Sequence, residues 1–338
     1  MFDLLRRRRT PGAAATRATL SALCTVSILP FLWPAACGAQ AWPSKPVRMI
    51  VAFPPGGGTD LVARIVAPRL SDAIGQPVIV DNRAGAAGLV GTEVAAKAAP
   101  DGHTLFLGTL GNLSVNPLLY PKLAFDVERD QQPVTNVVAV TFMLYAHPSM
   151  PVRSVKDLVA LAQARPGQLN YASSGAGGAP HLGAELFNLL AGVRLVHVPY
   201  KGSAQSFTDV IAGHVPVTFD SLVQGLQYVK DGRLRALATL GAKRSAVLPE
   251  VPSVGETLAG YDVTNWFGLV TQSAVPREVV ARLNADVVKL LRTPDARDRL
   301  LALGAESIGD TPEQFGAFMK AESRKWARVI REAKIRAD

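Results

Sequence analysis

The stretch VRMIVAFPPGGGTD, residues 47–60, decides the fold. A strand-like apolar run leads into two prolines, three glycines and a threonine, and an apolar helical pattern follows from Leu61 to Leu70. Glycines let a backbone close around a ligand, and the unpaired N–H groups of a first helical turn attract anions. No lysine follows the glycines as in a phosphate loop, and the spacing does not match G-x-G-x-x-G. The stretch therefore predicts a site for a small anion such as a carboxylate, and not for a nucleotide.

Residues 1–41 are expected to be an export signal. Four arginines at 6–9 precede an apolar segment over 20–32, which is too short to span a membrane. Ala39-Gln40-Ala41 has the small-x-small pattern of a cleavage site, so Trp42 is the expected first residue of a mature periplasmic protein. The arginines leave general secretion and the twin-arginine route both open.

Removal of this segment changes what the composition allows. Both cysteines, Cys24 and Cys37, lie within it, so a mature chain has no thiol for disulfides, thiolate metal sites or nucleophilic catalysis. Lipid attachment at Cys37 is the weaker alternative, because Pro34 fits that signal poorly. Five arginines and one aspartate are also removed, which lowers the net charge from +9 to +5. With no basic block in the remaining 297 residues, nucleic acid is not an expected partner.

Strand and helix patterns alternate along the first part of the mature chain. This βαβαβ order predicts a parallel sheet with helices on both faces and ligand-binding loops at the carboxyl ends of its strands. The expected strands are 47–53, 77–81 and 104–108, and the expected helices are 59–73 and 88–98.

A second α/β unit follows one long apolar strand predicted over residues 134–147. Its expected helices are 154–164, 181–191 and 203–212, and its expected strands are 169–173, 194–199, 215–219 and 234–240. A return strand over 263–271 precedes helices 276–292, 294–303 and 312–332, the last with Thr311 as N-cap and Pro312 at its first position. Two such units joined by two crossing segments predict an α/β protein of two lobes with a central cleft. We expect 42–147 and 248–338 to form the first lobe and 148–247 the second.

The chain resembles a known family at several places in order. Its opening, KPVRMIVAFPPGGGTD, is similar to the start of the solute-binding receptors of tripartite tricarboxylate transporters, the Bug or TctC type. Further matching segments are VIVDNRAGAAGLVGT (78–92), PDGHTLFLGT (100–109), VNPLLYPKL (115–123), LNYASSGAGGAPHLGAELF (169–187), HVPYKGS (197–203) and LPEVPSVGETLAGYD (248–262). The resemblance covers essentially the whole mature chain and implies a bilobed periplasmic binding protein fold of type II with two crossing strands. It also implies a small organic acid as ligand and the membrane subunits of a transporter as partner.

The same resemblance implies which residues hold the carboxylate between the lobes. The positions that match the family's two loops, its acidic position beside the cleft and its variable loop are Pro55, Gly56, Gly57, Gly58, Thr59, Ser173, Ser174, Gly177, His181, Asp220, Thr109 and Asn112. No catalytic residue, metal or cofactor is expected, and we expect a monomer.

Several of these residues have a second interpretation. Thr59 is the expected N-cap of helix 59–73, and Asp60 is expected to hold the glycine loop from behind instead of facing the ligand. His181 is either a hydrogen-bond donor to the ligand or a structural histidine. Asp220 either binds an amino group of the ligand or caps the following helix. Trp266 and Phe267 are either core residues or part of the cleft wall.

Two other classes of function stay open at this point. An exported hydrolase would use Ser174, although Ala172 removes the G-x-S-x-G nucleophile pattern, or a metal held by His181 and Glu185. A sensory protein that presents its ligand to a membrane kinase would have the same ligand site as a transport receptor.

Overall fold

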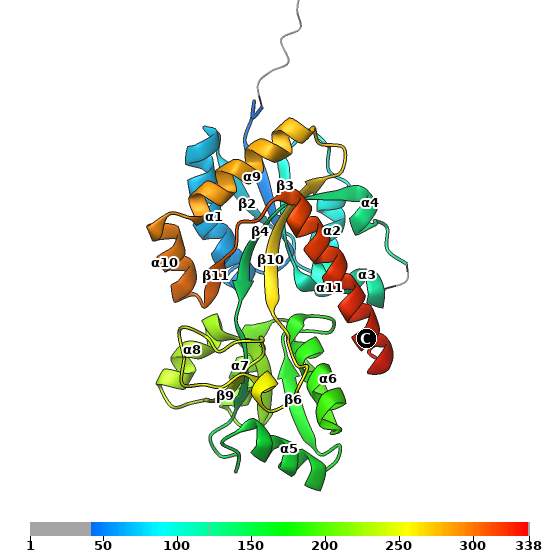
Figure 1. The fold of residues 1–338 in the computed structure, drawn as a ribbon, viewed down its shortest axis with the longest axis vertical. Coiled ribbons are helices and arrows are strands. Elements are labelled where there is room, and N and C mark those ends of the chain that lie inside the picture. Colours follow the sequence, from blue (N-terminus) through cyan, green and yellow to red (C-terminus); the bar gives the residue numbers. More distant parts are fainter. Residues whose placement is uncertain (1–41, 121, 337–338) are drawn as a thin grey trace, which may run out of the picture. The chain divides into compact units, whose positions relative to one another are not determined.

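The computed structural model describes residues 42–336 apart from residue 121. The predicted export signal lies outside the described residues. Within them, the strands form two sheets, which occupy the upper and lower parts of Figure 1. No helix in this part of the chain has the length and apolarity that crossing a membrane requires.

The first sheet contains six of the described strands. Its parallel part, β1, β2 and β3, confirms the predicted βαβαβ unit. Strand β10 is antiparallel to both of its neighbours, β3 and β4, so the sheet is mixed and not purely parallel. In sheet order the strands are β11 (Ala305–Ser307), β4 (Gln131–Val140), β10 (Asn265–Gln272), β3 (Thr104–Thr109), β1 (Val47–Val51) and β2 (Val78–Asn82).

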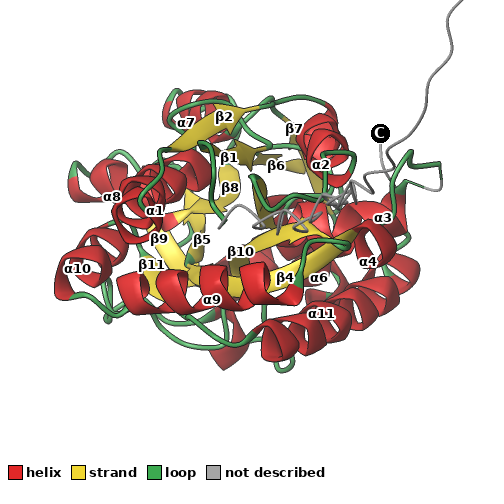
Figure 2. Cartoon of the chain, turned by 90° about the horizontal axis from the view of Figure 1, so that it is seen from above, coloured by secondary structure: helices red, strands yellow, loops and turns green. Residues whose placement is uncertain are grey.

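Helices surround this sheet on both faces (Figure 2). The α-helices are α1 (Gly58–Ile74), α2 (Leu89–Ala96), α3 (Asn116–Leu119), α4 (Val127–Asp130), α9 (Arg277–Leu291), α10 (Pro294–Ala302) and α11 (Pro312–Glu332), with single turns of 3₁₀-helix η1 (Ala86–Gly88) and π-helix η2 (Gly111–Val115). The predicted start of α11 is confirmed, since Thr311 and Gln314 form a reciprocal capping box and Pro312 begins the helix.

The second sheet contains five described strands and is also mixed. Strand β6 is parallel to β7 and β8, whereas β5 is antiparallel to β8 and β9. In order the strands are β7 (Leu195–Pro199), β6 (Leu169–Ser173), β8 (Val217–Ser221), β5 (Phe142–Ala146) and β9 (Arg235–Thr239). The accompanying helices are α5 (Val155–Ala164), α6 (Ala179–Ala191), α7 (Ser203–Ile211), α8 (Leu222–Lys230) and the 3₁₀ turn η3 (Val254–Glu256).

The chain crosses between the sheets at two adjacent places. The prediction of one strand over 134–147 is wrong, because β4 ends in the first sheet and β5 begins in the second. Thr141 lies between them, with its N–H bonded to the carbonyl of Gly304 at 3.0 Å and its carbonyl bonded to the N–H of Leu222 at 3.0 Å. The return crossing lies beside it, because Asn265 at the start of β10 pairs with Val140.

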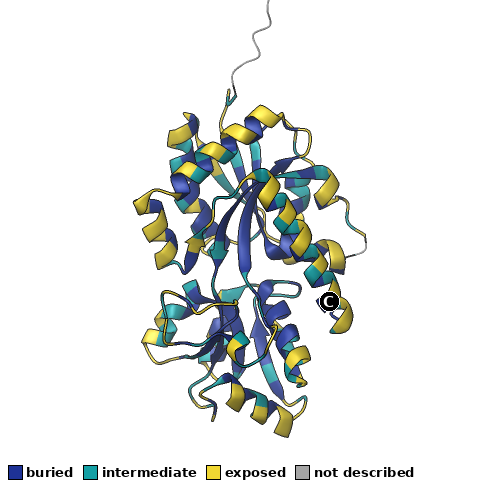
Figure 3. Ribbon diagram, in the orientation of Figure 1, coloured by how far each residue is buried: buried dark blue, intermediate teal, exposed yellow. Residues whose placement is uncertain are grey.

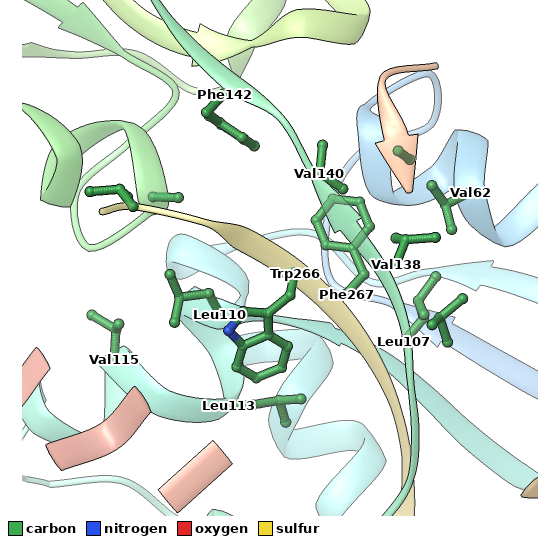
Figure 4. Packing of buried hydrophobic residues seen from close by; sticks show 14 of the residues in the cluster. Val62, Leu107, Leu110, Leu113, Val115, Val138, Val140, Phe142, Trp266 and Phe267 are labelled. Carbon is green, nitrogen blue, oxygen red and sulfur yellow. The ribbon is translucent and has the colours of Figure 1, made fainter. Parts of the chain in front are cut away.

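Buried strands form the centre of each part, and exposed positions gather on the outer faces of the helices (Figure 3). At the crossing, the two neighbouring aromatic residues of β10 point to opposite sides of the sheet, as Figure 4 shows. Trp266 lies in the core, edge-to-face with Phe315 and Phe318 at ring-centroid distances of 5.5 and 5.4 Å. Phe267 points the other way, toward Val138 and Val140 (Figure 4).

Candidate functional site

A cavity of about 540 Å³ opens between the two sheets. Three loops that follow the carboxyl ends of parallel strands make most of its wall, as expected for an α/β fold. These loops are 53–59 after β1, 174–180 after β6 and 201–205 after β7; the remaining wall consists of Ala87, Thr109, Gly111, Asn116, Phe142, Ser221, Gln224, Asn265 and Phe267. The volume suits a small molecule.

Local chemistry fixes the loop between β1 and α1. Gly56 has a φ of +81°, which a residue with a side chain rarely adopts, and its N–H donates to Oδ2 of Asp60 at 2.9 Å. The same oxygen accepts from Arg64 Nε at 2.8 Å, and Asp60 Oδ1 accepts from Asn82 Nδ2 at 3.0 Å. The expectation that Asp60 holds the loop from behind is therefore confirmed, because its side chain is buried and does not line the cavity.

Hydrogen bonds keep the buried Asp60 carboxyl ionised. Burial raises the pKa of this carboxyl, but the hydrogen bonds from Arg64, the Gly56 N–H and Asn82 outweigh burial and hold the pKa below its usual value. The buried ionised group thus stays an acceptor for the loop at neutral pH.

Helix α1 begins one residue earlier than predicted. Thr59 was expected to be its N-cap, but the N-cap is Gly57, which has no side chain, and Thr59 is the second residue of the helix. The prediction relied on the preference of threonine for the N-cap position, and α1 does not follow that preference. Since no side chain caps α1 within the described structure, the N–H groups of its first turn are left for a ligand.

The loop between β6 and α6 is held at both ends by stacked rings. His181 lies parallel to His197 at a centroid distance of 4.1 Å, and His197 lies against Tyr171 at 4.9 Å. His197 Nε2 is 2.6 Å from Ser173 Oγ at the start of the loop. His181 Nδ1 accepts from the N–H of Gly177 at 3.0 Å near its end. We call these three rings the ring column.

The ring column explains why two predicted residues do not line the cavity. Ser173 and His181 are both buried, and both hold the loop instead of facing the open space. Burial, together with the smaller effect of the neighbouring His197, lowers the pKa of His181 to about 3. His181 therefore stays neutral and accepts the Gly177 N–H across the physiological pH range.

Asp220 lies behind the wall made by α7 and α8. Its Oδ1 accepts from Ser203 Oγ at 2.7 Å and from the N–H of Ser221 at 2.8 Å, and both serines line the cavity. Burial raises the pKa of Asp220 to about 6, although the two hydrogen bonds oppose this rise.

The predicted residues thus fall into two groups. Pro55, Gly56, Gly57, Gly58, Thr59, Thr109, Ser174 and Gly177 line the cavity, whereas Asn112, Ser173, His181 and Asp220 lie behind its wall. Asn112 Oδ1 accepts from the N–H and hydroxyl of Thr109 at 3.2 and 3.0 Å, so it holds the end of β3 in place.

Sequence reasoning missed the wall contributed by α7 and α8. The segment Lys201-Gly202-Ser203 has a signal that was available, since glycine and serine follow a strand and precede a helix as in the first loop. Phe142 and Asn265 have no such local signal, because the crossing between the sheets brings them to the cavity.

The electrostatics of the cavity favour an anion. Helices α1, α6, α7 and α8 all begin at its wall, and their N-caps, Gly57, Gly178, Gly202 and Ser221, make no side-chain capping bond within the described chain. The N-termini of α1, α6 and α7 carry a partial positive charge on first-turn N–H groups that can face a ligand. At α8, Asp220 already binds the N–H of Ser221, and the carbonyl of Thr141 binds that of Leu222. Of the described lining residues, Lys201 alone is charged. Phe53, Phe142 and Phe267 add apolar surface for a carbon skeleton.

The groups that a hydrolase or a metal site would need are occupied otherwise. A serine–histidine pair is formed by Ser173 and His197, but Ser173 is fully buried. Glu185, the proposed metal partner of His181, accepts from the Tyr171 hydroxyl at 2.7 Å. No cluster of three or more metal-binding side chains occurs among residues 42–120 and 122–336.

The family model described as "Tripartite tricarboxylate transporter family receptor" matches residues 62–335. The chain belongs to this family of receptors. A relative, Protein BugT of Bordetella pertussis, is 37% identical over 298 residues, which cover 87% of this chain and 91% of BugT.

Solved structures of similar receptors share the fold. A protein of R. palustris with adipate has a TM-score of 0.83 and 36% identity, covering 88% of this chain and all of that one. MatC from Rhodopseudomonas palustris with bound malate has a TM-score of 0.79 and 31% identity, covering 85% and 99%. The periplasmic binding protein BugD has a TM-score of 0.80 and 30% identity, covering 88% and 100%. The bilobed α/β fold expected from the sequence is thereby confirmed.

Proposed function

We propose that this receptor captures a small organic acid in the cavity between its two sheets and delivers it to a tripartite transporter. The observation that carries the proposal is the convergence of three helix N-termini without side-chain caps, those of α1, α6 and α7, on one cavity. Such N–H groups and neighbouring hydroxyls can bind a carboxylate without a counter-ion. The similar receptors solved with adipate and with malate support an acid as the ligand.

We propose different roles for the predicted site residues. We propose that Ser174, Gly177, Thr109 and the loop from Pro55 to Thr59 contact the ligand, because they line the cavity. Asn112, Ser173, His181 and Asp220 would act by holding those contact residues in place, as their hydrogen bonds indicate. The two glycine-containing loops lie on different sheets, so closure onto an acid would draw the sheets together.

The remaining expectations belong to the same proposal. Residues 1–41 would direct export to the periplasm and be removed near Ala41, and the mature receptor would act as a monomer with the membrane subunits of the transporter. We propose lobe boundaries that follow the sheets, with the first crossing at Thr141 instead of at residue 147. The receptor would bind its ligand without chemical change, since its buried serine–histidine pair serves to hold a loop.

Thermal unfolding with a panel of acids tests the proposal. An acid present at 100 times its Kd is expected to stabilise the folded protein by about 2.7 kcal/mol. The panel should contain aliphatic dicarboxylates, hydroxy acids, amino acids and aromatic acids, with the neutral alcohols of the same skeletons as controls. The proposal fails if no acid raises the unfolding temperature, or if turnover of an ester or amide disappears in the Ser174→Ala variant.

A further inference from the structure

Positive charge gathers on helix α11, far from the loops that form the cavity. Residues 320–336 contain seven lysines and arginines and two glutamates, which gives this segment a net charge of +5. The whole of residues 42–338 also has a net charge of +5, so the charges of all its other residues cancel. The basic residues form no uninterrupted block in the sequence, and it is the helix that brings them together.

Four of these residues form a row along the outer side of α11. Lys320, Arg324, Arg328 and Arg331 follow one another at intervals of four, four and three residues, which places them on one face of a helix. All four are exposed, and the buried residues of α11 lie on the opposite face (Figure 3). We call these four residues the basic row.

The basic row lacks the charge pairing found on other helices of this protein. Helices α1, α9 and α10 each pair an exposed arginine with an aspartate four residues away. In the basic row, Arg328 pairs with Glu332 at 2.8 Å, whereas Lys320, Arg324 and Arg331 form no ion pair within the described part of the chain. Like charges four residues apart oppose helix formation. The row therefore keeps its charge at the expense of the helix, as expected of a surface that meets an anionic partner.

The opposite face of α11 packs behind the cavity wall. Trp266 Nε1 and Trp326 Nε1 both donate to Glu322 Oε2, at 3.4 and 3.1 Å, and so join α11 to β10. Trp266 lies between Asn265 and Phe267, which both line the cavity. A partner seated on the basic row is therefore separated from the cavity by α11 and β10 alone.

The composition of the row favours carboxylates of a protein over a lipid surface. Three of its four cations are arginines, whose planar guanidinium groups bind carboxylates through two parallel hydrogen bonds. A helix that lies on a membrane also inserts bulky apolar side chains into it. The exposed apolar residues of α11 are alanines, and its bulky residues Phe315 and Trp326 are buried in the protein.

We propose that the basic row is a docking surface for an acidic face of a membrane subunit of the transporter. This inference rests on the proposed function, because that function supplies the partner. A subunit that receives the acid must contact the receptor near its cavity, and α11 meets this condition. The charge pairing across the contact makes docking sensitive to salt.

Association of the receptor with the transporter's membrane subunits tests this inference. The probe is a vesicle of neutral phosphatidylcholine that contains the purified subunits, and association is measured by co-sedimentation. Lys320→Glu, Arg324→Glu and Arg331→Glu together should weaken association at least tenfold, because they place carboxylates against an acidic face. Glutamine at the same three positions should cause a smaller loss. Association of the unaltered receptor should weaken as salt is raised from 50 to 200 mM, the Debye length being about 10 Å at 0.1 M.

A matched control reverses three exposed charges elsewhere. Lys156, Arg165 and Lys230 lie on or next to α5 and α8, form no ion pair within the described structure and do not line the cavity. Lys156→Glu, Arg165→Glu and Lys230→Glu together change the net charge by the same amount and should leave association unchanged. Acid binding, measured by calorimetry, should persist in both triple variants, which shows that both are folded.

The inference is overturned if the basic-row variant associates as tightly as the unaltered receptor, or if the control loses association to the same extent. It is also overturned if vesicles of phosphatidylcholine and anionic phosphatidylglycerol without subunits bind the receptor as tightly as those with subunits, since the partner is then the lipid. A receptor that binds an acid but does not associate with the subunits overturns the inference and leaves acid capture intact. If no acid binds, the proposed function fails, whatever the vesicles show.

Discussion

Replacement of Asp60 by asparagine tests how the first loop is held. An asparagine side chain has nearly the same shape as aspartate, but it carries no charge. Its amide nitrogen, which donates, must also face one of the groups that donate to Asp60. The bonds at stake are those from Gly56 N–H and Arg64 Nε to Oδ2 and from Asn82 Nδ2 to Oδ1. We expect the lower-energy orientation to keep the amide oxygen toward Gly56, which leaves Asn82 without this acceptor.

The magnitude follows from the three bonds. A hydrogen bond to a charged group contributes about 1.5–3 kcal/mol and a neutral one about 0.5–1.5 kcal/mol, so the Gly56 bond weakens by about 1 kcal/mol and the Asn82 bond by about 2 kcal/mol. Arg64 is exposed to solvent, so its pairing with Asp60 adds little to this sum. Urea unfolding of Asp60→Asn should therefore show a loss of about 2–4 kcal/mol.

Acid binding should weaken in the same variant at least tenfold, because the loop that presents the first turn of α1 is less well fixed. Asp130→Asn is the matched control, since Asp130 also accepts the backbone N–H of the residue four positions earlier, Asp126, at 2.8 Å and has a lowered pKa, but does not line the cavity. The control should lose stability and keep its affinity. The reasoning is refuted if Asp60→Asn unfolds within about 0.5 kcal/mol of the unaltered protein, or if it loses stability without any loss of affinity.

Three further predictions concern the second sheet. His181→Ala removes the acceptor of the Gly177 N–H and one ring of the ring column. We expect the free energy of unfolding in urea to fall by about 2–4 kcal/mol and acid binding to weaken at least tenfold. Unchanged binding would contradict the role given to His181. Gly177→Ala and Gly192→Ala both place alanine at positive φ, +74° and +62°, at a cost of about 1–2 kcal/mol each, but calorimetry should show weaker binding for Gly177→Ala alone. The raised pKa of Asp220, about 6 in the folded protein, means that the folded state holds this proton more tightly than the unfolded chain, so stability should fall as pH rises from about 4 to 6 by roughly 3 kcal/mol. Asp220→Asn should lack this decrease, and equal pH profiles of the two proteins would show that Asp220 does not titrate as described.

Local sequence patterns predicted the elements that local chemistry determines. The strand and glycine turn of 47–60 and the capping of α11 by Thr311 both rest on neighbouring residues, and both were found. The apolar run 134–147 satisfies the pattern of one long strand. Its division at Thr141 depends on bonds to Gly304 and Leu222, which are distant in the sequence.

Helix α8 was missed for a related reason. Gly225 lowers the helical tendency of its sequence, and this glycine is required by packing, because a Cβ there would lie 2.3 Å from the Tyr145 hydroxyl. The place of Asn265 at the cavity could not be predicted either, since it lies where the two crossings meet. Positions behind the wall, such as Ser173 and His181, share a motif with the lining residues, and sequence alone does not separate the two groups.

The central claim is that the N-termini of α1, α6 and α7 at the cavity recognise a carboxylate. The most direct test is calorimetric titration with the best-binding acid and with its primary amide, which keeps the shape but removes the charge. The acid should bind at least 100-fold more tightly than the amide, a difference of about 2.7 kcal/mol. Equal affinity for the two would contradict the account.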